Sequence, residues 1–244
     1  MMKRQLRQIA VMLFPLLATL GVILVFLVLL RETTDIESGP IEIMDAFWRS
    51  VSTRGELSGR KVAAVLEFWI PLTLASIGLI LTFRAGLWNI GVEGQMALGG
   101  LAASAFTFSV VIESPLLMIP LSIIAAMLGG AAWALIAGVL RTRFGVNEIF
   151  SGVALNALAN QVTLLLIAGP WRPLDSDKAQ YSRAIPSAAR LPGIDREFNV
   201  SVLALLITFA AILIVIFVLN RTRWGLNLKA VGRNPKSALL LGVP

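Results

Sequence analysis

The sequence contains neither cysteine nor histidine. The lack of cysteine excludes disulfide bonds, thiolate metal sites and cysteine nucleophiles, and the lack of histidine removes the commonest metal ligand and general base. A Walker A phosphate-binding loop is also missing, because the nearest stretch, GELSGRK at residues 55–61, has the wrong spacing. We therefore expect no catalytic residues, no metal site, no cofactor and no ATP hydrolysis by the chain itself.

Charged residues are scarce as well. They make up 14% of the 244 residues, whereas about 25% is usual in a soluble domain, and 57% of the residues are hydrophobic. The mean hydropathy is +0.83. The formal net charge of +7 does not indicate nucleic-acid binding, because the basic residues lie in short segments between apolar runs, where they orient a membrane protein. We expect the chain to contact membrane lipid and no nucleic acid.

Several apolar runs are long enough to form helices that cross the bilayer's hydrocarbon core of about 30 Å. The first is too long for a signal peptide, and no small-residue cleavage site follows it. The fourth carries Ala126, Gly130, Ala134 and Gly138 at every fourth position, which lets another helix approach closely. The sequence therefore predicts an all-α fold, a polytopic transmembrane helix bundle of six spans. These are residues 9–30, 62–83, 92–112, 116–140, 149–169 and 201–219.

The distribution of Lys and Arg predicts how these spans are oriented. If the N-terminus is inside, the inner segments are short and rich in basic residues, whereas the outer ones include two long loops with most of the acids. This pattern predicts a multi-pass protein of the plasma membrane with a cytoplasmic N-terminus. Pro244 follows an apolar turn without a polar tail, so we expect a C-terminally truncated protein. The predicted parts are an N-terminal transmembrane span (1–30), an extracytoplasmic loop with a short interfacial helix at 45–52 (31–61), a transmembrane core (62–219) and a cytoplasmic segment (220–244).

A polar stretch, FRAGLWNIGVEGQM at residues 83–96, interrupts the apolar sequence between the second and third spans. Asn89, Glu93 and Gln95 are candidates to line a path for a polar solute, because such a path needs converging donors and acceptors in a cavity. The alternative is a surface turn with Glu93 in the first turn of a helix. The basic Arg84 favours a bend at the inner membrane face.

The fifth span carries two further candidates. Asn156 and Asn160 lie four residues apart and therefore share a helix face. They would either face the same path or bond a neighbouring helix, as amides do in membrane bundles. Just before them, Asn147 followed by Glu148 is typical of a helix N-cap with an acid in the first turn.

The stretch FRAGLWNIGVEGQ at 83–95 resembles the phrase FRAGLFNIGAEGQ of permease subunits of ABC importers for nucleosides and simple sugars, within the branched-chain amino acid and ribose permease family. Two more stretches agree in the same order. They are GVNEI at 145–149, followed by Asn156, and TRWGLNLKAVGRNPKSA at 222–238. The resemblance covers about residues 60–244, and members of the family are longer.

The resemblance implies a permease that moves its solute by alternating access. It would pair with a second permease subunit, a cytoplasmic ABC ATPase subunit and an extracytoplasmic substrate-binding protein. The proline-rich loop 170–200 is the candidate contact for the substrate-binding protein. A short cytoplasmic helix at about 234–241 would dock on the ATPase. The candidate coupling residues are Gly232, Arg233, Asn234, Pro235, Ala238 and Gly242.

Two alternatives remain at this point. One is a permease for another small polar solute, such as a branched-chain amino acid. The other is an intramembrane enzyme that acts on a lipid-linked substrate through Arg84, Asn89 and Glu93, although the lack of His and Cys disfavours most hydrolytic chemistry. The sequence does not name the solute or decide between homodimeric and heterodimeric permease pairing.

Overall fold

The computed structural model is mostly helical. It describes residues 21–22, 25, 40–53, 56–173, 181–194, 198–240 and 242–243. The predicted first span, residues 9–30, lies almost entirely outside the described residues. The chain divides into two compact units, Met1–Val65 and Leu66–Pro244.

The described part of the first unit contains a helix and a small strand pair. Helix α2 (Pro40–Val51) has Glu42 in its first turn and Arg49 in its last, which matches the helix dipole. An ion pair joins Asp45 to Arg49 one turn apart. Strands β1 (Ser52–Thr53) and β2 (Glu56–Leu57) follow as an antiparallel pair. The helix predicted at 45–52 is therefore confirmed, but it begins earlier.

Four helices in the described residues are long and apolar enough to cross a membrane. They confirm helices at four of the predicted spans, to within four residues at each end. A fifth helix, α4 (Val92–Ser109), occupies most of the predicted third span, but it contains Glu93, Gln95 and three glycines and is not among the four. The four are α3 (Gly59–Arg84), α5 (Pro115–Phe144), α6 (Glu148–Ala168) and α7 (Val202–Arg221).

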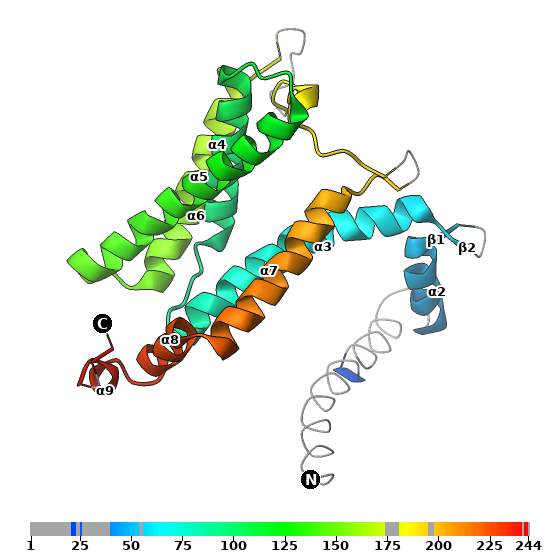
Figure 1. The fold of residues 1–244 in the computed structure, drawn as a ribbon. Helices are drawn as coiled ribbons and strands as arrows, with labels where there is room; N and C mark the ends of the chain where they lie inside the picture. The colour runs from blue at the N-terminus through cyan, green and yellow to red at the C-terminus, as the bar shows by residue number, and fades with distance from the viewer. Residues whose placement is uncertain are drawn as a thin grey trace. The chain divides into compact units, whose positions relative to one another are not determined.

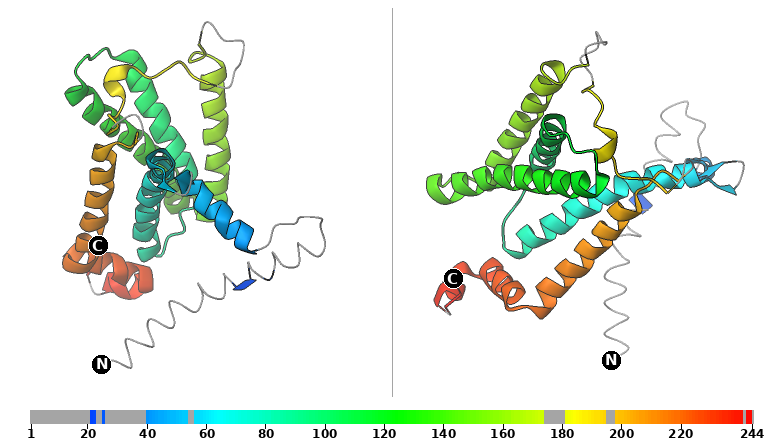
Figure 2. Two further views of the ribbon diagram at one scale, coloured as in Figure 1. Left: turned by 90° about the vertical axis from the view of Figure 1, so that its right-hand side faces the viewer. Right: turned by 45° about the horizontal axis from the view of Figure 1, so that its top comes forward.

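Helices α4, α5 and α6 pack side by side (Figures 1 and 2). Glycines bring α4 and α5 into backbone contact: a Cβ added at Gly99 would lie 2.9 Å from the carbonyl oxygen of Ala126, and one added at Gly130 would lie 3.1 Å from that of Gln95. The small residues predicted to allow close approach do so at Ala126 and Gly130. No atom of the described residues beyond the adjoining turns of α5 lies within 4 Å of a Cβ added at Gly138.

Two short helices follow α7. Helix α8 (Arg223–Arg233) has Thr222 as its N-cap, and the hydroxyl of Thr222 accepts the backbone N–H of Gly225 at 3.1 Å. Helix α9 (Pro235–Leu240) lies within the helix predicted at 234–241. Helix α8 was not predicted, and neither was the 3₁₀ turn η1 (Ser187–Ala189) in the proline-rich loop.

Candidate functional site

The polar stretch after α3 forms a tight bend. Gly86 has φ 74°, a left-handed conformation that glycine adopts without steric cost. The N–H of Gly86 bonds the carbonyl of Phe83 at 3.1 Å, and that of Leu87 bonds the carbonyl of Thr82 at 2.9 Å. This pair of bonds is the Schellman motif that ends a helix. The predicted bend is therefore present, and α4 begins eight residues after α3 ends.

Asn89 and Gln95 bond each other across the start of α4. The Asn89 Nδ2 donates to Gln95 Oε1 at 3.2 Å, and the Gln95 Nε2 donates to Asn89 Oδ1 at 3.0 Å. Each amide therefore uses one donor and one acceptor on the other. The N-cap position of α4 is Gly91, which has no side chain to cap the helix. The amide pair instead ties the residues before α4 to its first turn.

Asn156 caps α4 from a different helix. Its Oδ1 accepts the backbone N–H of Gly94 at 2.8 Å, and its Nδ2 donates to the carbonyl of Ile90 at 3.0 Å. The N–H of Gly94 is one of the first-turn donors that have no partner inside a helix. Asn156 on α6 satisfies that donor. This arrangement favours the bonding role for Asn156 over the solute-path role.

Glu93 and Asn160 form the exposed side of the same cluster. The Asn160 Nδ2 donates to Glu93 Oε1 at 3.3 Å, and both residues are exposed. The carboxylate retains acceptor capacity for a hydroxyl or amine of a ligand. The five residues predicted for the path thus come together where the start of α4 meets α6, and we call them the α4 cluster. Its members are Asn89, Glu93, Gln95, Asn156 and Asn160.

Trp133 of α5 lies beside this cluster and was missed by sequence reasoning. Its indole nitrogen is buried and has no hydrogen-bond partner within the described part of the chain. A Cβ added at Gly94 would lie 2.9 Å from that nitrogen and also 2.9 Å from Asn156 Oδ1. Only glycine at position 94 leaves room for both groups. The sole sequence signal was a tryptophan set among small residues of an apolar run.

A cavity of about 160 Å³ lies against the bend and is lined in part by Asn89, Gln95, Arg141 and Glu148. It is smaller than the roughly 300–1,000 Å³ of typical ligand pockets. Arg141 and Glu148 form an ion pair between the end of α5 and the start of α6. Asn147 caps α6, since its side chain accepts the backbone N–H of Ile149 at 2.8 Å. The predicted cap is therefore confirmed.

The bend also contacts α8 through backbone. A Cβ added at Gly232 would lie 2.1 Å from the carbonyl oxygen of Arg84, and one added at Gly86 would lie 3.2 Å from the Cα and oxygen of Gly232. Both positions must be glycine for this approach. The structure thus places a candidate coupling residue directly against the polar stretch, on a separate part of the bend from the α4 cluster.

The other candidate coupling residues shape the end of α8 and all of α9. Arg233 ends α8, and Pro235 begins α9. The side chain of Asn234 accepts the backbone N–H of Ser237 at 3.1 Å, and Ala238 is buried. Gly242, with φ 76°, ends α9 by bonding the carbonyl of Leu239 at 3.1 Å.

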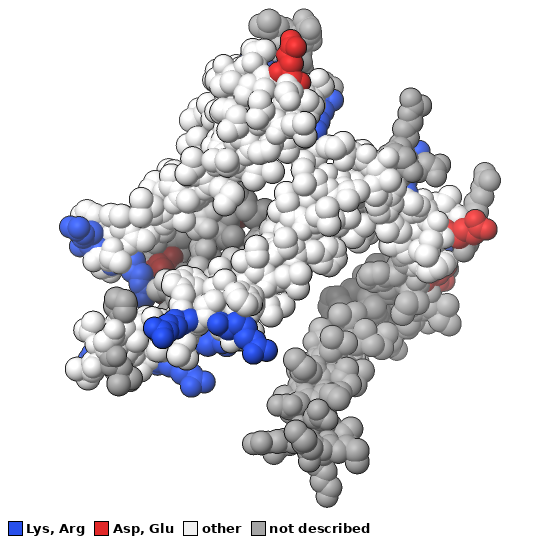
Figure 3. All heavy atoms as spheres, in the orientation of Figure 1, with Lys and Arg blue, Asp and Glu red and all other residues white. Residues whose placement is uncertain are grey.

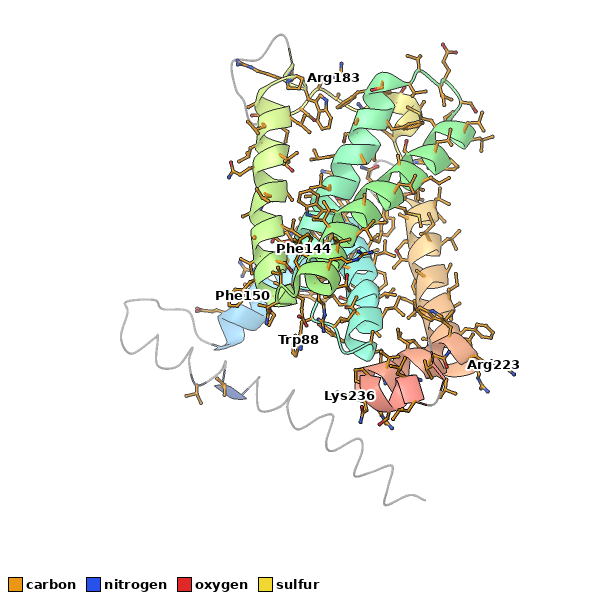
Figure 4. The ribbon with its side chains drawn as sticks, turned by 90° about the vertical axis from the view of Figure 1, so that its left-hand side faces the viewer. Trp88, Phe144, Phe150, Arg183, Arg223 and Lys236 are labelled. Atoms are coloured by element: carbon orange, nitrogen blue, oxygen red, sulfur yellow. The ribbon has the colours of Figure 1, made fainter. Side chains whose placement is uncertain are left out.

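Trp88 of the bend and Lys236 of α9 lie toward one end of the helices, and Arg183 lies at the other (Figure 4). Lys and Arg side chains gather over α8 (Figure 3). At the opposite end, the guanidinium of Arg183 lies over the ring of Phe108, 4.2 Å from its centroid, and the same ring contacts Trp171. These contacts attach the proline-rich loop to the C-terminal end of α4.

A protein-family model described as "Branched-chain amino acid transport system / permease component" matches residues 62–244. A glucose ABC transporter permease protein of Haloferax volcanii is 34% identical over 73% of this chain and 49% of its own length. Two guanosine ABC transporter permease proteins of Bacillus subtilis are 31% and 27% identical over 75% and 97% of this chain, and 58% and 66% of their own lengths. The chain spans about half to two thirds of the length of these curated relatives. No solved structure gives a significant match.

Proposed function

Since the chain belongs to the family of branched-chain amino acid transport system permease components, we propose that it is the permease subunit of an ABC importer for a nucleoside or simple sugar. It is a multi-pass membrane protein and not itself an enzyme, so the alternative of an intramembrane enzyme is set aside. The observation that carries the proposal is the match over residues 62–244 together with relatives named as glucose and guanosine permeases.

The α4 cluster supports a polar solute. Sugars and ribosides present hydroxyl groups, and the exposed Glu93 carboxylate and Asn160 amide offer acceptors and a donor to such groups. The amides of Asn89, Gln95 and Asn156 hold the start of α4 in place behind them. In this proposal Glu93 and Asn160 contact the solute, and the other three residues position α4.

The same proposal includes the importer's other parts. A separate cytoplasmic ABC ATPase subunit drives alternating access, a second permease subunit completes the path and an extracytoplasmic binding protein delivers the solute. Six spans cross the plasma membrane, with residues 1–30 as the first span, 31–61 outside and 220–244 in the cytoplasm. Helix α9 docks on the ATPase, and the bend–α8 contact transmits its movement toward the α4 cluster. The arrangement of Gly86, Gly232 and Ala238 supports this step.

A second candidate solute is a branched-chain amino acid, which the description of the matching family favours. Its ammonium group would form an ion pair with the carboxylate of Glu93, whereas a neutral sugar would form only hydrogen bonds with that carboxylate. Competition for uptake separates these solutes. If the solute is a nucleoside or sugar, unlabelled guanosine or glucose should reduce the uptake of the same labelled compound. Excess leucine should leave that uptake unchanged.

The complete importer, expressed from its own gene cluster, provides the test of the function. We expect the permease to co-purify with the ATPase and to stimulate its ATP hydrolysis. Glu93→Gln should abolish most solute uptake while the complex still assembles. Glu113→Gln is the matched control, because Glu113 is also exposed but lies in the turn after α4. Equal uptake by both variants would show that Glu93 does not contact the solute. Failure of the chain to form a complex with the ATPase would refute the proposal that it is a permease subunit.

A further inference from the structure

A groove of about 500 Å³ runs between α3 and α7, which lie side by side in Figure 1. Trp69 of α3 contacts Phe209 of α7, with their ring centroids 5.9 Å apart, and thereby joins the two helices. Ser76 also lines the groove, but its hydroxyl donates to the carbonyl of Leu72 at 2.7 Å, so its polarity is satisfied within the helix. The apolar lining includes Leu72, Ile77, Ile80, Ile212, Val215 and Ile216.

The groove is long enough for a lipid acyl chain. It extends along α3 from Trp69 to Arg84, fifteen residues apart, which corresponds to about 22 Å of helix. The acyl chains of one leaflet occupy about half of the roughly 30 Å hydrocarbon core. A chain from one leaflet therefore fits along the groove with its polar end near Arg84.

The end of the groove at Arg84 is basic. Arg84, Asn220 and Lys229 line it there, and Lys229 donates one bond to Asn220 at 3.2 Å. A neighbouring hollow of about 610 Å³ shares Arg84 and Lys229 and adds Arg233. Among the described residues, no acidic side chain lines the groove or the hollow.

These cations have no carboxylate partner in the part of the chain that the structure describes. Two ion pairs found there join Asp45 to Arg49 and Arg141 to Glu148, and none of these four residues lines the groove or the hollow. Cations held together without counter-charge repel one another, and an anionic group between them relieves that repulsion. Basic pockets between transmembrane helices are a recognised mode of binding acidic lipid head groups.

We propose that the α3–α7 groove binds one anionic phospholipid. Its acyl chain lies between α3 and α7, and its phosphate is held by Arg84 and Lys229, with Arg233 beside it. A guanidinium binds phosphate through two parallel N–H groups, and an ammonium adds a point charge. A single lipid molecule therefore accounts for both features of the groove: its acyl chain covers the apolar lining, and its phosphate neutralises the basic end. This inference requires only a membrane protein, and it stands whether or not the chain transports a solute.

The lipid is placed to affect the bend. Arg84 is the last residue of α3, and its carbonyl oxygen is the atom that Gly232 approaches. A phosphate bridging Arg84 and Lys229 therefore links the end of α3 to α8 beside the same contact. We expect bound anionic lipid to raise the thermal stability of the chain.

Native mass spectrometry of the purified full chain in neutral detergent tests the proposal. The probes are phosphatidylglycerol and phosphatidylcholine with the same palmitoyl and oleoyl chains, together with glycerol phosphate, which has the head group alone. Each Lys or Arg near an acidic lipid is worth about fivefold in affinity. We expect one phosphatidylglycerol molecule to bind roughly 30-fold more tightly than phosphatidylcholine, and glycerol phosphate not to bind detectably.

Two pairs of variants locate the site. Arg84→Gln with Lys229→Gln should remove the preference for phosphatidylglycerol, whereas Arg143→Gln with Arg223→Gln removes as much charge outside the groove and should leave it. On α7, Ile216→Trp fills the groove, and Leu213→Trp is the control because it does not line it. Ile216→Trp should lower binding of phosphatidylglycerol.

Four results would overturn the lipid site. The first is equal affinity for the two phospholipids, and the second is an equal effect of the two charge pairs. The third is unchanged phosphatidylglycerol binding in Ile216→Trp, and the fourth is a self-associated chain in which a second copy occupies the groove. Thermal unfolding of each variant without added lipid verifies that loss of binding is not loss of fold.

Discussion

Replacing Gly232 by Ala tests whether the bend and α8 are in backbone contact. The added Cβ would lie 2.1 Å from the carbonyl oxygen of Arg84 and 3.0 Å from the carbonyl carbons of Arg84 and Ala85. Ordinary van der Waals contact begins near 3.4 Å. All the opposing atoms belong to the backbone, so no side-chain rotation relieves the overlap. The two segments must separate by about 1 Å, which disturbs the bend itself.

The expected magnitude follows from two opposing effects. Alanine is favoured over glycine in a helix interior by roughly 0.5–1 kcal/mol, and less near the end of α8 where Gly232 lies. Overpacking at a tight contact costs typically about 1–3 kcal/mol. We expect Gly232→Ala to lower the free energy of unfolding by about 1–2 kcal/mol. For a chain of this size, 1 kcal/mol corresponds to a shift in Tm of roughly 2–4 °C.

Thermal unfolding of the purified chain in detergent, followed by tryptophan fluorescence, measures the effect. Gly78→Ala in α3 and Gly138→Ala in α5 are matched controls, because a Cβ at either position lies more than 4 Å from the other atoms of the described chain beyond the adjoining turns of its own helix. Both controls should match or exceed the parent's Tm. A Gly232→Ala Tm equal to that of the controls would refute the reasoning.

Further predictions concern the caps. Asn156→Leu leaves the Gly94 N–H without its acceptor and should lower the free energy of unfolding by about 1–2 kcal/mol. Asn160→Leu removes only the 3.3 Å bond at an exposed position and should lower it less. Equal Tm values for the two variants would contradict the capping role of Asn156. Asn147→Ala removes a 2.8 Å cap from α6 and should cost about 1 kcal/mol, while Ser201→Ala removes a weaker 3.4 Å cap from α7. The same unfolding assay compares the losses, and a larger one for Ser201→Ala would contradict the ranking.

The helices were largely predictable because an apolar run long enough to cross a bilayer has few other folded solutions. The second predicted span, 62–83, corresponds to α3 at Gly59–Arg84, and the N-cap at Asn147 is present. Helix α8 was missed because it is amphipathic and mixes charged residues among the apolar ones, so no apolar run indicated it. The helix at the predicted third span, α4, ends at Ser109 instead of residue 112, and the next residue, Val110, is extended.

The residues of the α4 cluster could be predicted as site candidates, because they are polar groups within apolar sequence. Their hydrogen-bond partners could not be predicted. Asn156 and Asn160 share a helix face, yet one caps α4 and the other bonds an exposed carboxylate. Which of these roles an amide takes depends on the helix that packs against it. The spacing of residues within one helix carries no information on that partner.

Helices at four of the apolar runs, a bend beside Arg84 and the family could all be predicted from the sequence, because each depends on a local run or phrase. The contact of Gly232 with Arg84 and the groove between α3 and α7 with its basic end are evident only in the folded chain. The physical reason is that these features belong to pairs of distant segments. Close packing selects the pairing through the fit of both surfaces at once.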